Sequence, residues 1–303
     1  MPHPVISIII PCYNHGRYID EAIQSVELYP DKNSYEIIII NDGSTDDYTN
    51  QRLNELKDKG YHVVFQENQG LGKTRNNAVK LAKGQYILPL DADNKIKPEY
   101  ISLAHEILNN EPDIAVVYGD MELFGAKSGT WQSGPFDIVR LLECNYIDAC
   151  AVYRKSAWEK CGGYKEDMPM PGMEDWDFWL SLAENNFGFK YINKPLFCYR
   201  HLDSSMLRSL TAEQMKKLNE FIYSHHLNLY VTLFPDPISL THQLHAKDRY
   251  IKMLEQGLDE IELSFTYRLG NFLIKPFRFF RRPLMGTRNR EKNVGCSKKP
   301  IKI

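Results

Sequence analysis

Two acidic residues, Asp91 and Asp93, follow directly after the apolar run Tyr86–Leu90 and are separated by the small residue Ala92. The run has the length and composition of a buried strand. Acids at positions i and i+2 beyond such a strand can hold a divalent cation, which can in turn hold a diphosphate. An Asp-x-Asp sequence is common by chance, so its place after a strand is what makes this pair a candidate site.

A glycine-rich turn, Gly70–Thr74, precedes these acids in the chain. It is not a P-loop, because Glu67 stands where that motif requires glycine, and it lacks the third glycine of a dinucleotide-binding loop, where Arg75 stands instead. What remains is a tight turn that leads into a helix, and an arginine near the start of a helix can meet an anionic ligand. An ordinary helix start with a solvent-facing Arg75 is the alternative.

A second polar turn, Asn41–Asp46, follows another apolar run. Ser44 or Thr45 is suited to cap the helix that comes next. Asp42, at the strand edge, can accept a hydrogen bond from a nucleotide base. The two interpretations are compatible with each other.

Two later segments also carry candidate side chains. Glu174 and Asp175 open an aromatic-rich helix after a Pro-Gly turn. Acids are favoured there by the helix dipole, and a carboxylate beside a cleft is also what a general base requires. Arg200 and His201 end a predicted strand, where they can neutralise phosphate and ligate a metal ion, although an ordinary surface histidine is equally compatible.

Strands and helices alternate over the first 120 residues. This alternation predicts βαβ units and a mostly parallel sheet, that is, an α/β fold. Ligands of such sheets bind beyond the carboxyl ends of the strands, and the polar residues above fall at those ends. We expect strands at 5–10, 35–40, 61–66, 86–90 and 114–118, and helices at 16–28, 46–59, 71–83 and 98–110.

The remaining chain divides into three further segments. We expect residues 1–120 to form the nucleotide-sugar-binding half of one domain, and residues 121–210, with short strands and one helix at 174–185, to form its acceptor-side half. Residues 211–263 have a helical pattern, which predicts a helical extension. Residues 264–303 form a basic tail.

Composition and length limit the class of protein. The chain has 303 residues, 43% of them apolar and 25% charged, which is typical of a soluble globular protein. Its six cysteines contain no C-x-x-C pair and so no redox or zinc motif of that kind. The apolar run at the N-terminus ends at Pro11, too soon for a signal peptide, and no run is long enough to span a bilayer. We therefore expect a cytoplasmic protein.

The basic tail has an amphipathic pattern. At about 100° per residue, Leu269, Phe272 and Phe280 fall on one side of a helix, and Arg278 falls on the other among further basic residues. Such a helix is typical of an anionic membrane surface, although Pro276 would kink it. A helix that packs on the domain is the alternative. No recognition module for nucleic acid accompanies the tail, so we expect no nucleic-acid partner.

Five segments, in this order, resemble a family 2 inverting glycosyltransferase of the GT-A fold. The resemblance covers roughly residues 4–206. The matching segments are Ser7–Asn14, Glu36–Asp46, Asn68–Asn76, Asp91–Asp93 and Glu174–Asp175. Each segment alone is common, whereas five in order are specific.

The resemblance implies roles for individual residues. It implies that Asp175 is the catalytic base, with Glu174 a weaker candidate, and that Asp93 binds Mn²⁺ or Mg²⁺ with assistance from His201. It also implies a set of residues that bind the nucleotide-sugar donor: Pro11, Tyr13, Asn14, Asp42, Asn68, Gly70, Arg75, Asp91, Ala92 and Arg200.

The implied activity is transfer of a sugar, with a UDP-sugar as the default donor and a lipid-linked or glycan acceptor in surface-polysaccharide or glycolipid biosynthesis. The Q-x-x-R-W element of processive synthases is absent, which favours addition of one or a few sugars. With the basic tail, the enzyme would lie on the inner face of the cell membrane. A catalytically inactive membrane-associated scaffold and a sugar-1-phosphate nucleotidyltransferase are the alternatives; the latter lacks its glycine-rich signature after residue 10.

Overall fold

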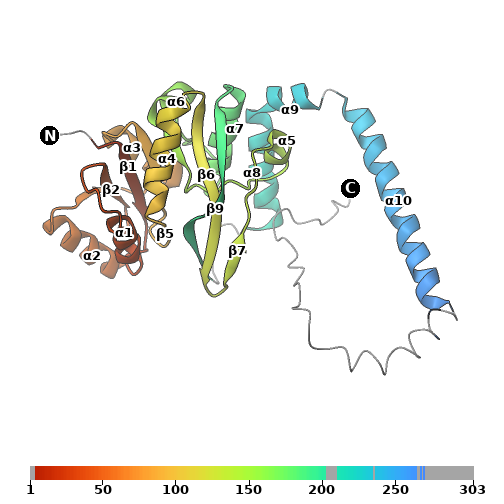
Figure 1. The fold of residues 1–303 in the computed structure, drawn as a ribbon, viewed down its shortest axis with the longest axis horizontal. Coiled ribbons are helices and arrows are strands. Elements are labelled where there is room, and N and C mark those ends of the chain that lie inside the picture. The colour runs from red at the N-terminus through yellow and green to blue at the C-terminus, as the bar shows by residue number, and fades with distance from the viewer. Residues whose placement is uncertain (1–3, 203–209, 235, 265–266, 268, 270–303) are drawn as a thin grey trace. The chain divides into compact units, whose positions relative to one another are not determined.

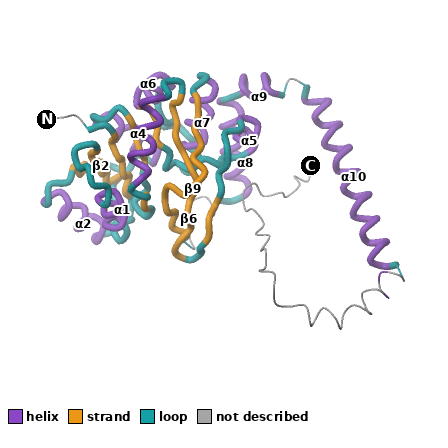
Figure 2. The backbone as a smooth tube through the Cα atoms, viewed as in Figure 1, coloured by secondary structure: helices purple, strands orange, loops and turns teal. Residues whose placement is uncertain are grey.

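The computed structural model describes residues 4–202, 210–234, 236–264, 267 and 269 (Figure 1). The chain divides into two compact units, Met1–Leu229 and Tyr230–Ile303. The first unit contains the sheet and all the predicted site residues. The second contains one long helix, α10 (Pro237–Leu263), which Figure 2 shows as a continuous coil.

The first unit is built on a nine-stranded sheet. The strand order is β3-β2-β1-β4-β8-β6-β9-β5, and β7 pairs with β6. The strands are β1 (Ile6–Cys12), β2 (Tyr35–Asp42), β3 (His62–Gln66), β4 (Tyr86–Pro89), β5 (Lys95–Ile96), β6 (Ile114–Gly125), β7 (Gly129–Trp131), β8 (Val152–Arg154) and β9 (Gly188–His201).

The sheet has a parallel part and a mixed part. Strand β1 pairs in parallel with β2 and β4, and β2 pairs in parallel with β3. Strand β8 is antiparallel to both of its neighbours, β4 and β6, whereas β6 and β9 are parallel. The predicted α/β class is confirmed, and the parallel arrangement expected from the strand–helix alternation is found among the first four strands.

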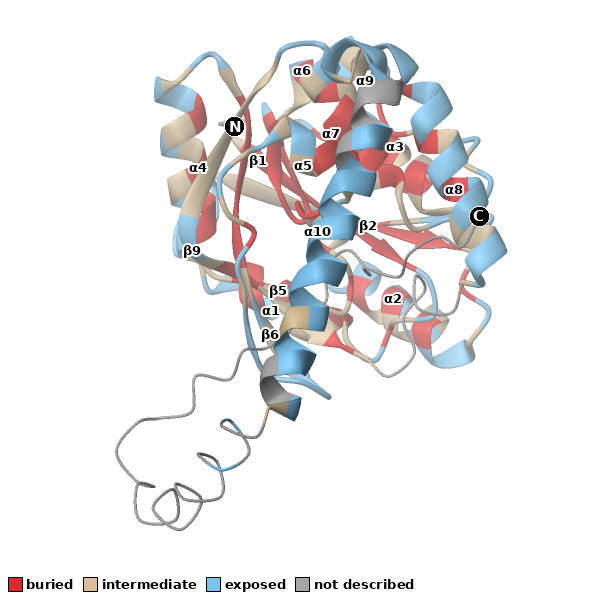
Figure 3. Ribbon diagram, turned by 90° about the vertical axis from the view of Figure 1, so that its right-hand side faces the viewer, coloured by how far each residue is buried: buried red, intermediate tan, exposed pale blue. Residues whose placement is uncertain are grey.

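Helices cover both faces of the sheet. Apolar residues of α1, α2 and α4 share a buried cluster with Ile6, Ile8 and Ile10 of β1, and α3 packs on β1 and β2 from the other face, where it also meets α7. Figure 3 shows the buried residues gathered along β1 and adjacent strands. The helices of this unit are α1 (Ile19–Glu27), α2 (Asp47–Asp58), α3 (Leu71–Leu81), α4 (Glu99–Asn110), α5 (Ile138–Glu143), α6 (Lys155–Cys161), α7 (Glu174–Glu184) and α8 (Ala212–His225); α9 (Leu227–Leu233) begins in it.

The cap of α2 differs from the prediction. Asp46, and not Ser44 or Thr45, is the N-cap, since its carboxylate accepts a hydrogen bond from the Thr49 amide. The hydroxyls of Ser44 and Thr45 instead accept hydrogen bonds from Asn14 of the neighbouring loop. A tertiary contact has therefore displaced the local capping preference by one or two residues.

The helical extension is observed as α8, α9 and α10, and none of the described helices is long and apolar enough to cross a membrane. The predicted amphipathic tail, residues 264–303, lies outside the described residues except for Ser264, Tyr267 and Leu269.

Candidate active site

The predicted site residues of the first half gather at one edge of the sheet. Strands β3, β2, β1 and β4 are neighbours and parallel, so their carboxyl ends lie side by side. Tyr13 and Asn14 follow β1, Asp42 ends β2, Asn68 follows β3, and Asp91 follows β4. Short apolar runs with polar ends thus place these side chains together, as the parallel pattern predicts.

Tyr13 and Asn14 form the loop after β1. The Tyr13 side chain is 46% exposed and is available to a ligand, whereas Pro11 before it is buried in the strand. Asn14 has a φ of 58°, and its Oδ1 accepts hydrogen bonds from the amides of Thr45 (2.8 Å) and Asp46 (3.2 Å). Asn14 therefore joins the loops after β1 and β2.

Asp42 is buried and organises the turn after β3. Its carboxylate accepts hydrogen bonds from the Gln66 side chain (2.7 Å) and from the amides of Gln69 (2.8 Å) and Gly70 (3.1 Å). The side chain of Asn68 in turn donates to the Asp42 carbonyl oxygen (2.9 Å). Three protein donors already hold this carboxylate, so its direct role toward a base stays a prediction.

Arg75 is one of the most buried side chains of the unit, so the solvent-facing alternative is wrong. It lies in α3 and is 2% exposed. One Nη donates to Asp91 (3.0 Å) and the other to Glu174 (3.2 Å). Burial opposes its charge, but the two carboxylates outweigh this effect and raise the pKa of Arg75. The arginine thus joins the end of β4 to the start of α7.

The two candidate bases on α7 differ in their surroundings. Glu174 is buried, and its second carboxylate oxygen accepts a hydrogen bond from the Gly172 amide (2.7 Å). Asp175 is partly exposed and accepts one from the Asn145 side chain (2.9 Å). Burial, and then the charge of Glu174, raises the pKa of Asp175 to about 6. Asp175 is therefore the accessible carboxylate of the pair, with a pKa suited to a base near neutral pH.

Asp148 is an acid beside the candidate site that the sequence interpretation did not name. It is half-buried just before β8 and accepts a hydrogen bond from the Cys150 amide (2.9 Å). Burial, followed by the charge of Asp91, raises its pKa to about 7, and Asp175 adds to the effect. A signal existed in the sequence, because Asp148 interrupts an apolar stretch, but no spacing linked it to the other acids.

Asp93 and Ala92 form the turn after β4, which the end of β9 holds in place. The Arg200 side chain donates to the Asp93 carbonyl oxygen (2.9 Å), and the Arg200 amide donates to the Asn94 side chain (2.8 Å). Burial, and then the charge of Asp91, raises the pKa of Asp93. Two repelling carboxylates offer the oxygen ligands that Mg²⁺ and Mn²⁺ prefer, so this pair fits such an ion.

His201 lies buried at the last position of β9, next to Arg200. Among the described residues, one set of three metal-ligating side chains has ligand atoms that all lie within 4.8 Å of one another. Asp91, Asp93 and His201 are not that set. That set lies elsewhere in the unit. Metal binding by His201 beside the acids after β4 therefore stays a prediction.

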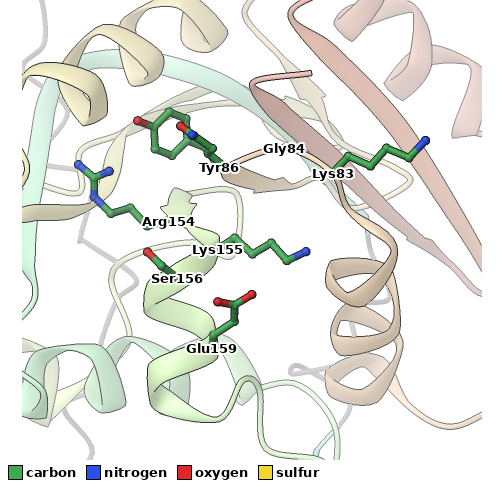
Figure 4. A pocket seen from close by; sticks show the side chains of 8 residues that line it. Lys83, Gly84, Tyr86, Arg154, Lys155, Ser156 and Glu159 are labelled. Carbon is green, nitrogen blue, oxygen red and sulfur yellow. The ribbon is translucent and has the colours of Figure 1, made fainter. Parts of the chain in front are cut away.

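A cavity of about 450 Å³ lies at the opposite edge of the sheet, where β4 begins (Figure 4). Its lining includes Lys83, Arg154 and Lys155. Arg154 donates to the carbonyl oxygen of Ile114 (2.7 Å), and Lys155 to that of Ala82 (2.7 Å). These two cations bind backbone carbonyls, and none of the predicted site residues lines this cavity.

Comparisons with known proteins agree with the fold and the motifs. Residues 7–162 match the model of the family described as "Glycosyl transferase family 2". The chain is 29% identical over 224 residues to chondroitin synthase of Escherichia coli, covering 72% of this chain and 32% of that protein. It is 34% identical over 229 residues to EpsH of Bacillus subtilis (strain 168), covering 69% of this chain and 64% of that protein.

The fold is also similar to a solved structure, S. aureus TarS 1-349 in complex with UDP-GlcNAc. The TM-score is 0.56 at 21% identity, over 82% of this chain and 79% of that chain. This likeness concerns the fold. The chain spans about a third of the length of the E. coli synthase that it matches. Since the family match covers residues 7–162, more than half of the chain, the chain belongs to glycosyltransferase family 2.

Proposed function

We propose that the protein transfers a sugar from a nucleoside-diphosphate sugar to an acceptor hydroxyl, with inversion at the anomeric carbon. One observation carries this proposal: Arg75 contacts both Asp91 and Glu174. This buried arginine brings the acids after β4, suited to a donor, next to Asp175 on α7, suited to an acceptor. In a family 2 chain, these are the two components that the reaction needs.

Each component has a proposed role. Pro11, Tyr13 and Asn14 would line the base pocket, beside Asp42 and the turn Asn68–Gly70. Asp91 and Ala92 would contact the ribose or the donor sugar, and Arg75 and Arg200 would offset negative charge nearby. Asp93, assisted by His201, would hold Mn²⁺ or Mg²⁺, which when bound neutralises charge on the diphosphate.

The proposed chemistry is a single displacement. Asp175 takes the proton of the acceptor hydroxyl, and the acceptor oxygen forms a bond to the anomeric carbon as the bond to the diphosphate oxygen breaks. The bonding pair leaves with the nucleoside diphosphate. Because the attack is in line and direct, the configuration inverts and no carboxylate becomes bonded to the sugar. Glu174, held by Arg75 and the Gly172 amide, positions its neighbour.

The similar proteins favour particular classes of donor and acceptor. The S. aureus TarS structure contains UDP-GlcNAc, and the E. coli relative is a chondroitin synthase. We therefore favour a UDP-sugar donor, with a hexosyl or N-acetylhexosaminyl group, and a glycan or lipid-linked acceptor in surface-polysaccharide synthesis. Attachment of residues 264–303 to an anionic membrane surface, on the cytoplasmic side, belongs to the same proposal.

Calorimetric titration of the full-length protein with UDP, dTDP and GDP, each with and without Mn²⁺, tests this function. Metal-dependent binding of one nucleotide class, weakened in an Asp93→Asn variant, is the expected result. Failure of all three nucleotides to bind folded protein would reject a nucleotide-sugar enzyme and favour the inactive scaffold.

A further inference from the structure

A cluster of metal-ligating side chains lies where α7 and α8 meet, outside the proposed reaction. The Oδ1 atom of Asp177 is 2.5 Å from Nδ1 of His225 and 3.1 Å from Nε2 of His226. The three ligand atoms all lie within 4.8 Å of one another. Asp177 and His226 are 1% exposed, whereas the His225 ring is 33% exposed.

A fourth residue supports the orientation of this cluster. Nδ1 of His226 lies 3.2 Å from the carboxylate of Glu184, at the end of α7. A carboxylate that accepts the Nδ1 proton leaves the Nε2 lone pair directed at Asp177. Metal-binding histidines almost always donate their second ring N–H to a carboxylate, a backbone carbonyl or a water molecule, which sets the tautomer and the ring orientation.

The chemistry of the ligands selects the class of ion. Two imidazole nitrogens and one carboxylate oxygen suit zinc and related transition metals, whereas Mg²⁺ and Ca²⁺ prefer oxygen ligands alone. The exposed part of the His225 ring provides an entry path. Three protein ligands leave one position of a tetrahedral site for water.

We propose that Asp177, His225 and His226 bind a divalent transition-metal ion, with zinc the best match, and that this ion fastens α8 to α7. The same atoms can instead form a bridge between carboxylates and a protonated imidazole, without metal. Since Asp177 lies two residues after Asp175 on α7, fastening at this point holds the turn that carries the proposed base. The ion is thus a positioning element, distinct from the Mn²⁺ or Mg²⁺ proposed at Asp93.

Cobalt provides a direct probe of this site. We would strip the full-length protein of metal and titrate Co²⁺ in a large excess of Mg²⁺, which occupies oxygen sites but competes poorly for imidazole. One Co²⁺ per chain with the visible absorption of a four-coordinate site, displaced by Zn²⁺, is expected. His225→Gln should weaken the affinity at least ~10-fold, and Glu184→Gln by ~10- to 100-fold.

His62→Gln is the matched control, because His62 is an exposed histidine on β3, away from the cluster. It should bind Co²⁺ like the wild type. Zinc should also raise the Tm of the wild type and of this control but not that of His225→Gln. If His225→Gln fails to fold, the wild-type spectrum and Glu184→Gln still decide. Absence of the visible band, or affinity unchanged in either cluster variant, overturns the proposal in favour of the metal-free bridge.

Discussion

At the scale of single residues, the candidate site contains more carboxyl groups than positively charged side chains. Arg75 binds two of the carboxylates directly, and a buried charge of this kind is stable only with such partners. Asp93, Asp148 and Asp175 are not among its direct ion pairs, and their pKa values are raised. An excess of carboxylates is what a site for a metal–diphosphate and a general base requires.

Asp175→Asn removes the proposed base while preserving the shape of the side chain. We expect kcat to fall by about 10²- to 10⁴-fold, because the acceptor hydroxyl loses its proton acceptor. Donor affinity should stay within a few-fold, measured by calorimetry with the nucleotide. Asp167→Asn, on the exposed loop before α7, is the control and should leave both quantities unchanged. A collapse of donor affinity in Asp175→Asn would instead assign Asp175 to binding or structure.

The pH dependence of the rate follows from the same carboxyl. Burial and the charge of Glu174 raise the pKa of Asp175, whereas Arg75, the Trp176 amide and Asn145 lower it, with a result of about 6. A base acts only when deprotonated, so kcat should rise as pH increases from 5 to 7 and then level off. A profile of kcat against pH with its midpoint near 4 would mean that Asp175 is not the titrating group.

At the scale of secondary-structure elements, the positions of individual strands and helices were predictable from the sequence. Strand β2 was expected at 35–40 and is Tyr35–Asp42, and the helix expected at 174–185 is Glu174–Glu184. Apolar runs and helix starts depend only on residues that are close together in the sequence, so a short window is enough to identify them. The burial of Arg75 was not predictable in this way, because its partner Glu174 lies 99 positions away in the chain.

The same reasoning explains what was missed around the site. The antiparallel insertion of β8 between β4 and β6 brings Asp148 toward Asp91, and no periodicity of the sequence encodes which strand pairs with which. The N-cap of α2 moved to Asp46 because Asn14 holds its neighbours. The roles assigned to individual site residues stay predictions.

Gly43 provides a test of the turn that joins β2 to the loop after β3. Its φ is +67°, and a Cβ there would lie 2.5 Å from the Asn68 amide nitrogen. Gly60, with a φ of +94° and nothing within 4 Å, is a matched control. In urea titrations, Gly60→Ala should lower the free energy of unfolding by about 1–2 kcal/mol, and Gly43→Ala by more. Only Gly43→Ala should weaken nucleotide binding; equal losses would contradict this role.

At the scale of the whole molecule, the site is confined to the first unit. Every buried apolar residue of the described core lies between Ile6 and Ile222, within that unit. Helix α10 of the second unit instead exposes apolar side chains, such as Ile251, Leu254 and Leu258. The first unit therefore has its own core, and we expect it to bind nucleotide without the tail.

Deletion of residues 264–303 tests the proposed membrane attachment. The deleted segment is rich in Lys and Arg, which would bind anionic lipid. The truncated protein should therefore no longer sediment with vesicles that contain anionic lipid. Its affinity for the nucleotide should equal that of the full chain. Full-length protein should bind vesicles more weakly at high salt and should not prefer duplex DNA. Truncated protein that still sediments with vesicles would contradict the role of the tail.

The bridge through Arg75 also affects how members of the family can be recombined. A hybrid that joins residues 1–120 of this chain to the later segment of a relative keeps Arg75 and Asp91 but replaces Glu174. If the incoming segment has no acid at that position, a buried guanidinium retains only one counter-charge, which is strongly destabilising. A stable hybrid therefore requires both an arginine in the first segment and an acid at the position of Glu174 in the second.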